Sequence, residues 1–301
     1  MATVGLLHPG EMGAAVGGCL VSVGHTVLWD PTGRSRASTG RALAAELTGV
    51  PFDALVPRCS VIFSVCPPHA ALDVARRVAA TGYAGIYVDA NAISVATAEQ
   101  VSAIVTAAGA AYVDGGIIGP PPEIAGHTRI YLSGPRASEV LALFGRSALQ
   151  ARIAEGPLYA ASALKMAYAA WTKGTGALLL AARALARAEG VERTLLAEWA
   201  LSQPALAKQS ERSAESAAAK GWRWVAEMEE IAASMTSVGL PAGFHEAAAD
   251  IYDRAAHADT VPANPGPANP GQTGRPSGGG RVRPGESDPP STLDTVISAL
   301  M

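Results

Sequence analysis

The 301-residue sequence has little charge and little cysteine. Charged residues make up 16% of the chain and the formal net charge is -3, so no basic excess favours nucleic acid as a partner. The cysteines are Cys19, Cys59 and Cys66, an odd number without a CxxC pair and without a histidine at metal-ligand spacing. We therefore expect no metal site, and we expect the cysteines to be small buried residues in a reducing cytosol.

Long apolar runs are also missing. A bilayer span needs about twenty uninterrupted apolar residues, and the Ala/Leu-rich stretch after Trp171 is interrupted by Lys173, Arg183 and Arg187. The N-terminus lacks the basic region and apolar core of a signal peptide. We expect a cytoplasmic protein that acts on a small molecule and has no membrane partner.

The first half of the chain alternates two patterns. Short β-branched runs, TVGLL, HTVLW, SVIFSV, GIYVD and AYVDGGII, are each followed by an Ala-rich stretch with helical spacing. This alternation predicts an α/β Rossmann domain over residues 1–157, with a doubly wound parallel sheet between two layers of helices.

The second half has helical patterns and no strand signal. Tyr159–Glu189 contains no proline and is dominated by Ala and Leu, which predicts one long, largely buried helix. Further helices are expected, with breaks at Gly190, Pro204, Gly221 and the turn at Gly239–Gly243. Together they predict an all-α substrate and dimerisation domain over residues 158–257.

The last part of the chain changes composition twice. Residues 258–290 are rich in proline and glycine, which predicts a disordered linker. Residues 291–301 regain a helical pattern, with Ser291 as the candidate N-cap. We expect this helix to dock on its own chain or on a partner subunit through one apolar face, formed by Leu293, Val296, Ile297 and Leu300.

The stretch Val4–Leu20, VGLLHPGEMGAAVGGCL, begins like a strand and continues like a helix. Gly10 and Gly13 lie where a dinucleotide-binding loop has glycines, whereas the first glycine position holds His8, followed by Pro9. Such a loop presents backbone N–H groups and the positive end of a helix dipole to a pyrophosphate. We predict a cofactor loop in which proline, lacking an N–H, reduces the number of donors. The alternative is a tight turn without a ligand.

Two later strand ends should lie in the same crevice. Val61–Val65 runs into Cys66 and Pro67, and Gly85–Asp89 is followed closely by Asn91, which could hydrogen-bond the nicotinamide ribose or the substrate, or only satisfy its own turn. The predicted cofactor-binding residues are His8, Pro9, Gly10, Glu11, Met12, Gly13, Asp30, Arg34, Ser35, Cys66, Pro67 and Asn91.

The end of the second strand bears on the choice between NAD and NADP. Asp30 could accept hydrogen bonds from ribose hydroxyls, which favours NAD. The following loop offers Arg34, Ser35 and Arg36 to a 2'-phosphate, so we predict that NADP(H) is preferred over NAD(H). The alternative is that these arginines are solvated surface charges.

These landmarks resemble the β-hydroxyacid dehydrogenase and 6-phosphogluconate dehydrogenase superfamily, which includes imine reductases. Its motif G-L-G-x-M-G corresponds to residues 8–13, and its motif D-A-P-V-S-G-G to residues 114–120, where Ile118 replaces the substrate-binding serine. The resemblance implies that Lys165 is the catalytic lysine, although Ala169 replaces the asparagine that follows it. The resemblance covers about the first 255 residues, and its C-terminal part is most similar to a poorly characterised subgroup.

The resemblance implies hydride transfer between nicotinamide and a substrate, with Lys165 as general acid in reduction and base in oxidation. Because Ile118 and Ala169 are apolar, we predict a small carbonyl/alcohol substrate that is less polar than an ordinary hydroxyacid. Two alternatives remain: an NADPH-dependent imine reductase, and a non-catalytic dinucleotide-binding protein. A lysine that reaches solvent from a helix end is the structural alternative for Lys165.

The helical half contains further candidates for the substrate pocket. Tyr168, Trp224, Met228 and His245 are predicted substrate-binding residues beside Ile118, although aromatic and methionine side chains at helical spacing are more often core residues. Acidic residues 227, 229 and 230 are interpreted as a solvated face, with a cationic substrate as the alternative. The long Ala-rich helix and the resemblance favour a homodimer through the helical domain.

Overall fold

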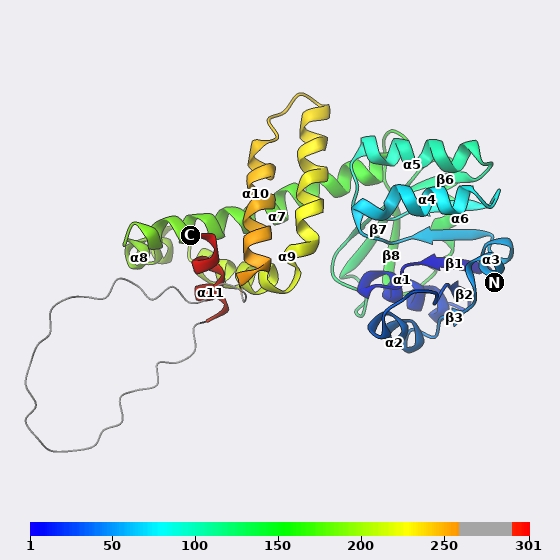
Figure 1. Cartoon of the computed structure of the whole chain (residues 1–301), viewed down its shortest axis with the longest axis horizontal. Helices are drawn as coiled ribbons and strands as arrows, with labels where there is room; N and C mark the ends of the chain where they lie inside the picture. The colour runs from blue at the N-terminus through cyan, green and yellow to red at the C-terminus, as the bar shows by residue number, and fades with distance from the viewer. Residues whose placement is uncertain (259–290) are drawn as a thin grey trace, which may run out of the picture. The chain divides into compact units, whose positions relative to one another are not determined.

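The computed structural model describes residues 1–258 and 291–301 (Figure 1). The predicted linker at 258–290 therefore lies, apart from its first residue, outside the described residues. Contacts divide the chain into two compact units. One comprises Met1–Thr172 with Ala226–Glu246, and the other comprises Lys173–Val225 with the described part of Ala247–Met301. The contacts thus group the first part of the long helix, and a segment near residue 230, with the sheet.

The first unit contains one eight-stranded sheet with the order β3-β2-β1-β4-β5-β6-β7-β8. β1 and β4 are neighbours although they are not consecutive, so the strand order reverses between them, as at the ligand-binding switch point of doubly wound sheets. The strands are β1 (Thr3–Leu7), β2 (Thr26–Trp29), β3 (Thr48–Gly49), β4 (Val61–Ser64), β5 (Ile86–Asp89), β6 (Ala111–Ile118), β7 (Thr128–Ser133) and β8 (Leu149–Ile153).

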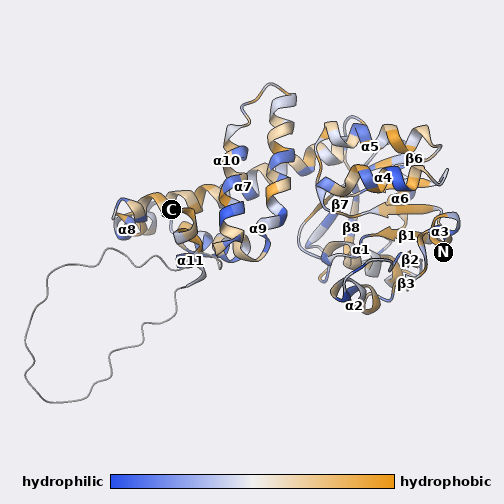
Figure 2. Cartoon of the chain, viewed as in Figure 1, coloured by the Kyte–Doolittle hydropathy of each residue, from blue (hydrophilic) through white to orange (hydrophobic). Residues whose placement is uncertain are grey.

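Helices cover both faces of this sheet. They are α1 (Glu11–Ser22), α2 (Arg36–Ala44), α3 (Phe52–Leu55), η1 (Val56–Arg58), η2 (Pro68–Ala70), α4 (Ala71–Ala79), α5 (Val95–Ala107) and α6 (Ala137–Ala142). Successive strand residues point to opposite faces, so each strand packs on both helix layers. Ile86 and Val88 of β5 pack in one core cluster with apolar residues of α1, α2 and α6, and Tyr87 packs in the other with residues of α3, α4 and α5. Figure 2 shows hydrophobic colours along the central strands and mixed colours along α4.

The five predicted strands are confirmed, but the sheet is not entirely parallel. β7 runs antiparallel to β6, with Asp114 paired to Ser133 and Ile118 to Arg129. β3, β7 and β8 were not predicted. β8 is an edge strand whose sequence, LQARI, has only one buried residue, so it lacks the apolar run that marked the others.

The long helix is confirmed as α7 (Ala160–Ala188), and it is followed by α8 (Glu192–Ser202), α9 (Leu206–Ser237) and α10 (Gly243–Ala256). The predicted break at Gly221 is wrong, since α9 continues through it. A Cβ atom at this position would lie 2.7 Å from the backbone oxygen of Tyr252. Gly221 therefore permits a close approach to α10 and does not end a helix.

The predicted C-terminal helix is confirmed as α11 (Thr292–Leu300), capped by Ser291 through a capping box with Asp294. It docks on its own chain in the second unit. Leu293, Val296 and Ile297 are buried, and Asp294 forms a 2.8 Å ion pair with Arg187 of α7.

Candidate functional site

The loop between β1 and α1 is a tight turn that leads directly into the N-terminus of a helix. His8 takes a left-handed backbone conformation with φ 68°, a region in which glycine is usual but histidine is enriched among other residues. The N–H of Gly10 then donates to the carbonyl oxygen of His8 at 2.8 Å, and Gly10 becomes the N-cap of α1 without a side-chain cap. The first N–H groups of the helix are thus left for an anionic ligand.

The two loop glycines serve different purposes. A Cβ atom at Gly13 would lie 2.4 Å from the backbone oxygen of His8, so only glycine lets the helix approach the loop this closely. A Cβ atom at Gly10 would meet nothing within 4 Å, which leaves open space before the helix. Glu11 is exposed at the first position of α1, and Met12 is partly buried against the core.

At the end of β2, Asp30 is buried and both of its carboxylate oxygens are occupied. Oδ1 accepts from the backbone N–H of Thr32 at 3.0 Å, and Oδ2 accepts from the guanidinium of Arg77 at 2.8 Å. Burial opposes ionisation of Asp30, but these hydrogen bonds outweigh it and hold the pKa of its carboxyl below the usual range. Arg77, on α4, was not among the predicted site residues.

The guanidinium groups of Arg34 and Arg77 lie close enough to His8 to affect its ionisation. Burial, reinforced by the charges of Arg34 and Arg77, lowers the pKa of His8 to about 4, so its imidazole is neutral at physiological pH. Nδ1 of His8 and Nε of Arg34 are buried without a hydrogen-bond partner among the described residues. Such donors and acceptors fit a bound polar ligand, because leaving them unmatched is unfavourable. Ser35 caps α2 by accepting from the backbone N–H of Ser38.

The ends of β4 and β5 are tied together by Asn91. Its Oδ1 accepts from the backbone N–H of Cys66 at 2.6 Å, and its Nδ2 donates to Oγ of Ser64 at 3.1 Å. Both bonds join Asn91 to the end of β4, so neither is the bond within its own turn that the sequence offered as the alternative to ribose binding. Burial raises the pKa of the Cys66 thiol to about 12, and Pro67 is exposed.

The acidic residue beneath this turn is fully buried. Oδ1 of Asp89 accepts from the backbone N–H of Asn91 at 3.0 Å, whereas Oδ2 has no partner among the described residues. Burial raises the pKa of Asp89 to about 7, against the lowering effect of the bond from Asn91.

Lys165 lies on the second turn of α7, and its Nζ donates to the backbone oxygen of Ile117 at 2.8 Å. Asp114 of β6 anchors the start of this helix by accepting from the backbone N–H of Ser162 at 2.8 Å. Because a Cβ atom at Gly116 would lie 2.5 Å from the oxygen of Ala161, glycine lets the helix approach β6 closely. Lys165 is therefore held at the carboxyl end of β6.

The predicted substrate-binding residues differ in how far they are exposed to solvent. Ile118 is buried at the end of β6, and Met228 is completely buried. Tyr168 is 47% exposed on α7, whereas His245 is 6% exposed with Nε2 3.5 Å from the backbone oxygen of Ala170.

Trp224 belongs to the second unit. There it packs against Tyr252 with ring centroids 5.0 Å apart, which favours the core alternative for this residue.

Glu230 is not part of a solvated face, which corrects the interpretation from the sequence. Its carboxylate accepts from the backbone N–H of Ser94 at 2.7 Å and from the hydroxyl of Thr97 at 2.9 Å, at the N-terminus of α5. A negative charge here stabilises the unpaired N–H groups of the helix. Glu229 remains exposed.

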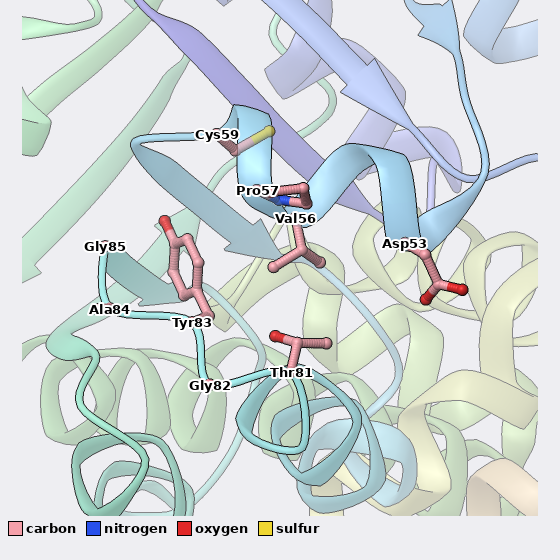
Figure 3. Close-up of a pocket in the computed structure, with 9 residues that line it drawn as sticks. All are labelled: Asp53, Val56, Pro57, Cys59, Thr81, Gly82, Tyr83, Ala84 and Gly85. Atoms are coloured by element: carbon pink, nitrogen blue, oxygen red, sulfur yellow. The ribbon is translucent and has the colours of Figure 1, made fainter.

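A surface pocket of about 590 Å³ lies elsewhere in this unit (Figure 3). Its lining residues precede β4 and β5, so it lies at the opposite edge of the sheet from the β1–α1 loop. The Tyr83 hydroxyl donates to the backbone oxygen of Ile86, and that of Thr81 to Val78. The pocket therefore offers few unused polar groups, and we do not assign the chemistry to it.

The described residues were also considered as metal ligands and as membrane spans, and they form neither. No three His, Cys, Asp or Glu side chains within 1–258 and 291–301 are grouped so that they could hold a metal ion. None of the helices in the described part of the chain is long and apolar enough to cross a membrane.

Comparisons with known proteins give one matching family model and solved structures of similar fold. Residues 186–255 match a family model described as a domain of unknown function, DUF1932. No curated protein matches the sequence significantly. Among solved structures, a conserved protein of unknown function, itself described as structurally similar to 3-hydroxyacid dehydrogenases, is 27% identical with a TM-score of 0.63, covering 84% of this chain and 97% of its own.

Two similar structures belong to enzymes. Mycobacterium tuberculosis 3-hydroxyisobutyrate dehydrogenase, solved with L-serine, is 20% identical with a TM-score of 0.63, covering 84% of this chain and 93% of its own. A reductive aminase from Aspergillus terreus, solved with NADPH4, cyclohexanone and allyl amine, is 19% identical with a TM-score of 0.54 and the same coverage. The chain thus has the fold of hydroxyacid dehydrogenases and reductive aminases, and the predicted resemblance is confirmed at the level of fold.

Proposed function

We propose that this protein is an NADP-dependent oxidoreductase that acts on a small carbonyl/alcohol pair, with Lys165 as general acid in reduction and general base in oxidation. The observation that carries the proposal is the placement of Lys165. Its Nζ is 2.8 Å from the backbone oxygen of Ile117. The last residue of β5, Asp89, pairs with Asp114, so Ile117 lies beyond the end of β5. This is the carboxyl edge of the sheet, which also carries the β1–α1 loop.

The residues of the β1–α1 loop fit a dinucleotide. The N-terminus of α1 and the open space at Gly10 would hold the pyrophosphate, and the unpartnered Nε of Arg34 would meet a 2'-phosphate. When bound, the nicotinamide donates or accepts the hydride. Lys165 would give a proton to the substrate oxygen or remove one from it. The preference for NADP rests on Arg34 and its surroundings.

The surroundings of Lys165 favour a substrate without a carboxylate. Ile118 and Ala169 are buried and apolar at the positions where the resemblance implies a serine and an asparagine. An imine is the second candidate substrate, because an apolar residue at position 118 suits it equally well and the fold is shared with a reductive aminase.

The test is NADPH consumption, followed at 340 nm, with a panel of ketones, aldehydes and preformed imines. Lys165→Met should reduce turnover by about 10²-fold or more, the usual contribution of a general acid, while NADPH affinity stays within about twofold. Lys208→Met, at an exposed position on α9, is the matched control and should retain full activity.

Unchanged turnover in Lys165→Met would contradict the role of this lysine. NADPH binding without turnover on any substrate would instead favour the non-catalytic protein.

We also propose that the chain forms a homodimer through its helical unit. Leu178 and Leu185 lie seven residues apart on α7 and are 55% and 64% exposed, and Trp222 of α9 is 60% exposed. Because seven residues are about two helical turns, Leu178 and Leu185 lie on one face of α7, and exposed apolar side chains on one face favour an interface. Light scattering coupled to size-exclusion chromatography should give twice the chain mass, and a lower mass for the double variant Leu178→Glu, Leu185→Glu. A monomeric parent would contradict this proposal.

A further inference from the structure

The acid that would favour NAD is not available to a ribose. A carboxylate that binds ribose hydroxyls needs an oxygen that faces the ligand. In Asp30 one oxygen is 2.8 Å from a guanidinium nitrogen of Arg77 and the other is 3.0 Å from the backbone nitrogen of Thr32. The Asp30 side chain is only 3% exposed, so little of it remains for a ligand.

Arg77 is itself held in place. Its guanidinium carbon lies 3.7 Å from the ring centroid of Phe52, a cation–π contact, while 48% of its side chain is exposed. The adjacent Arg76 provides a contrast. It pairs with Asp73 on the same helix, with both side chains largely exposed, where an ion pair contributes little.

The net charge of the side chains around the end of β2 is positive, which favours binding of an anion. Asp30 and Arg77 neutralise each other, and the imidazole of His8 is neutral at physiological pH. Arg34 adds a positive charge, and its buried Nε has no acceptor among the described residues. A phosphate group would supply that acceptor through a charge-assisted hydrogen bond.

We propose that Arg77 determines coenzyme specificity as a positioning residue. It holds Asp30 in an ion pair, which prevents recognition of an unphosphorylated ribose and cancels the charge that would repel a 2'-phosphate bound by Arg34. The inference rests on the proposed function because it requires a dinucleotide at the β1–α1 loop.

Calorimetric titration of the full chain tests this role, using NADPH, NADH, adenosine 2',5'-bisphosphate and AMP. The last two differ by the 2'-phosphate alone and report on the adenosine end without hydride transfer. In Arg77→Gln, NADPH and the bisphosphate should bind about tenfold more weakly, a loss of about 1.4 kcal/mol, whereas NADH and AMP should bind with unchanged or higher affinity. Arg76→Gln is the matched control and should bind all four ligands as the parent does.

A double variant distinguishes two possible actions of Arg77: neutralising Asp30, and binding the 2'-phosphate directly. If Arg77 acts by neutralising Asp30, then Asp30→Asn in the Arg77→Gln background should restore NADPH affinity to within about twofold of the parent. Failure to restore the NADPH affinity would mean that Arg77 binds the phosphate itself, which would overturn the proposal that it acts through Asp30. A circular dichroism spectrum of each variant identifies any that fail to fold.

Other outcomes would also overturn the inference. A tenfold loss of NADH affinity in Asp30→Asn alone would show that Asp30 binds the ribose in the parent. A parallel loss of NADPH and NADH in Arg77→Gln would reveal a merely structural role. Failure of the proposed function is distinguishable, since it would be seen in the parent as no binding of any dinucleotide, or as binding without turnover.

Discussion

Replacing Gly13 with alanine distinguishes two effects on stability: the steric clash expected from the close approach at the β1–α1 loop, and the general preference of helices for alanine over glycine. In the interior of a helix, alanine is favoured over glycine by about 1 kcal/mol. At Gly13 the new methyl group would lie 2.4 Å from the backbone oxygen of His8, and backbone cannot rotate away as a side chain can. Overpacking typically costs about 1–3 kcal/mol and the propensity gain offsets about 1 kcal/mol of it, so we expect a net loss of up to about 2 kcal/mol in the free energy of unfolding.

Gly18 provides the matched control on the same helix. A Cβ atom there would lie 3.5 Å from Cβ of Ala45, an ordinary van der Waals contact. We expect Gly18→Ala to stabilise the protein by about 0.5–1 kcal/mol, because only the propensity term acts. The two substitutions are chemically identical, yet their effects should have opposite signs.

Urea unfolding measures the two free energies, and calorimetry measures the affinity for NADPH. Gly13→Ala should weaken NADPH binding at least about tenfold, equivalent to 1.4 kcal/mol, because the displaced loop no longer presents its N–H groups correctly. Gly18→Ala should bind as the parent does. Equal stabilisation by both substitutions, with unchanged NADPH affinity, would refute the role given to this loop.

Three further substitutions test the surrounding structure. Asp89 has a folded pKa of about 7 against an ordinary 3.8, so the stability from its protonated form is present below pH 4 and is lost as the pH rises through 7. Asp89→Asn should remove up to about 4 kcal/mol of that pH dependence in urea titrations at pH 4 and pH 8, and identical profiles would contradict the assignment. Glu230→Gln should lower the free energy of unfolding by about 1 kcal/mol through loss of the charged cap, whereas the exposed Glu229→Gln should leave it unchanged. Gly221→Ala should lower the thermal midpoint of the helical unit because of the 2.7 Å approach to the Tyr252 oxygen, and a raised midpoint would contradict that packing.

Local patterns predicted the elements whose signals are local. The five buried strands, the β1–α1 turn and the Ser291 cap each depend on residues within a few positions, and all are present. Gly221 shows the limit of such reasoning. Its effect depends on the backbone of Tyr252, which the sequence near Gly221 does not reveal, so a glycine that permits packing was interpreted as a helix break.

The candidate site was predictable only in part, for the same reason. The positions of His8, Gly13 and Lys165 followed from motifs. The partner of Asp30 lies 47 residues away on α4, and Glu230 reaches a helix cap 136 residues away, so neither contact leaves a local pattern. In the proposed role of Arg77, its ion pair with Asp30 reverses the preference for NAD that Asp30 taken alone suggests.

The central claim is that the β1–α1 crevice binds NADP(H), and the most direct test is a calorimetric titration of the unmodified full chain with NADPH and with NADH. We predict one NADPH site per chain, with an affinity for NADPH at least about tenfold higher than for NADH, which corresponds to 1.4 kcal/mol. A higher affinity for NADH, or no binding of either dinucleotide, would contradict the claim.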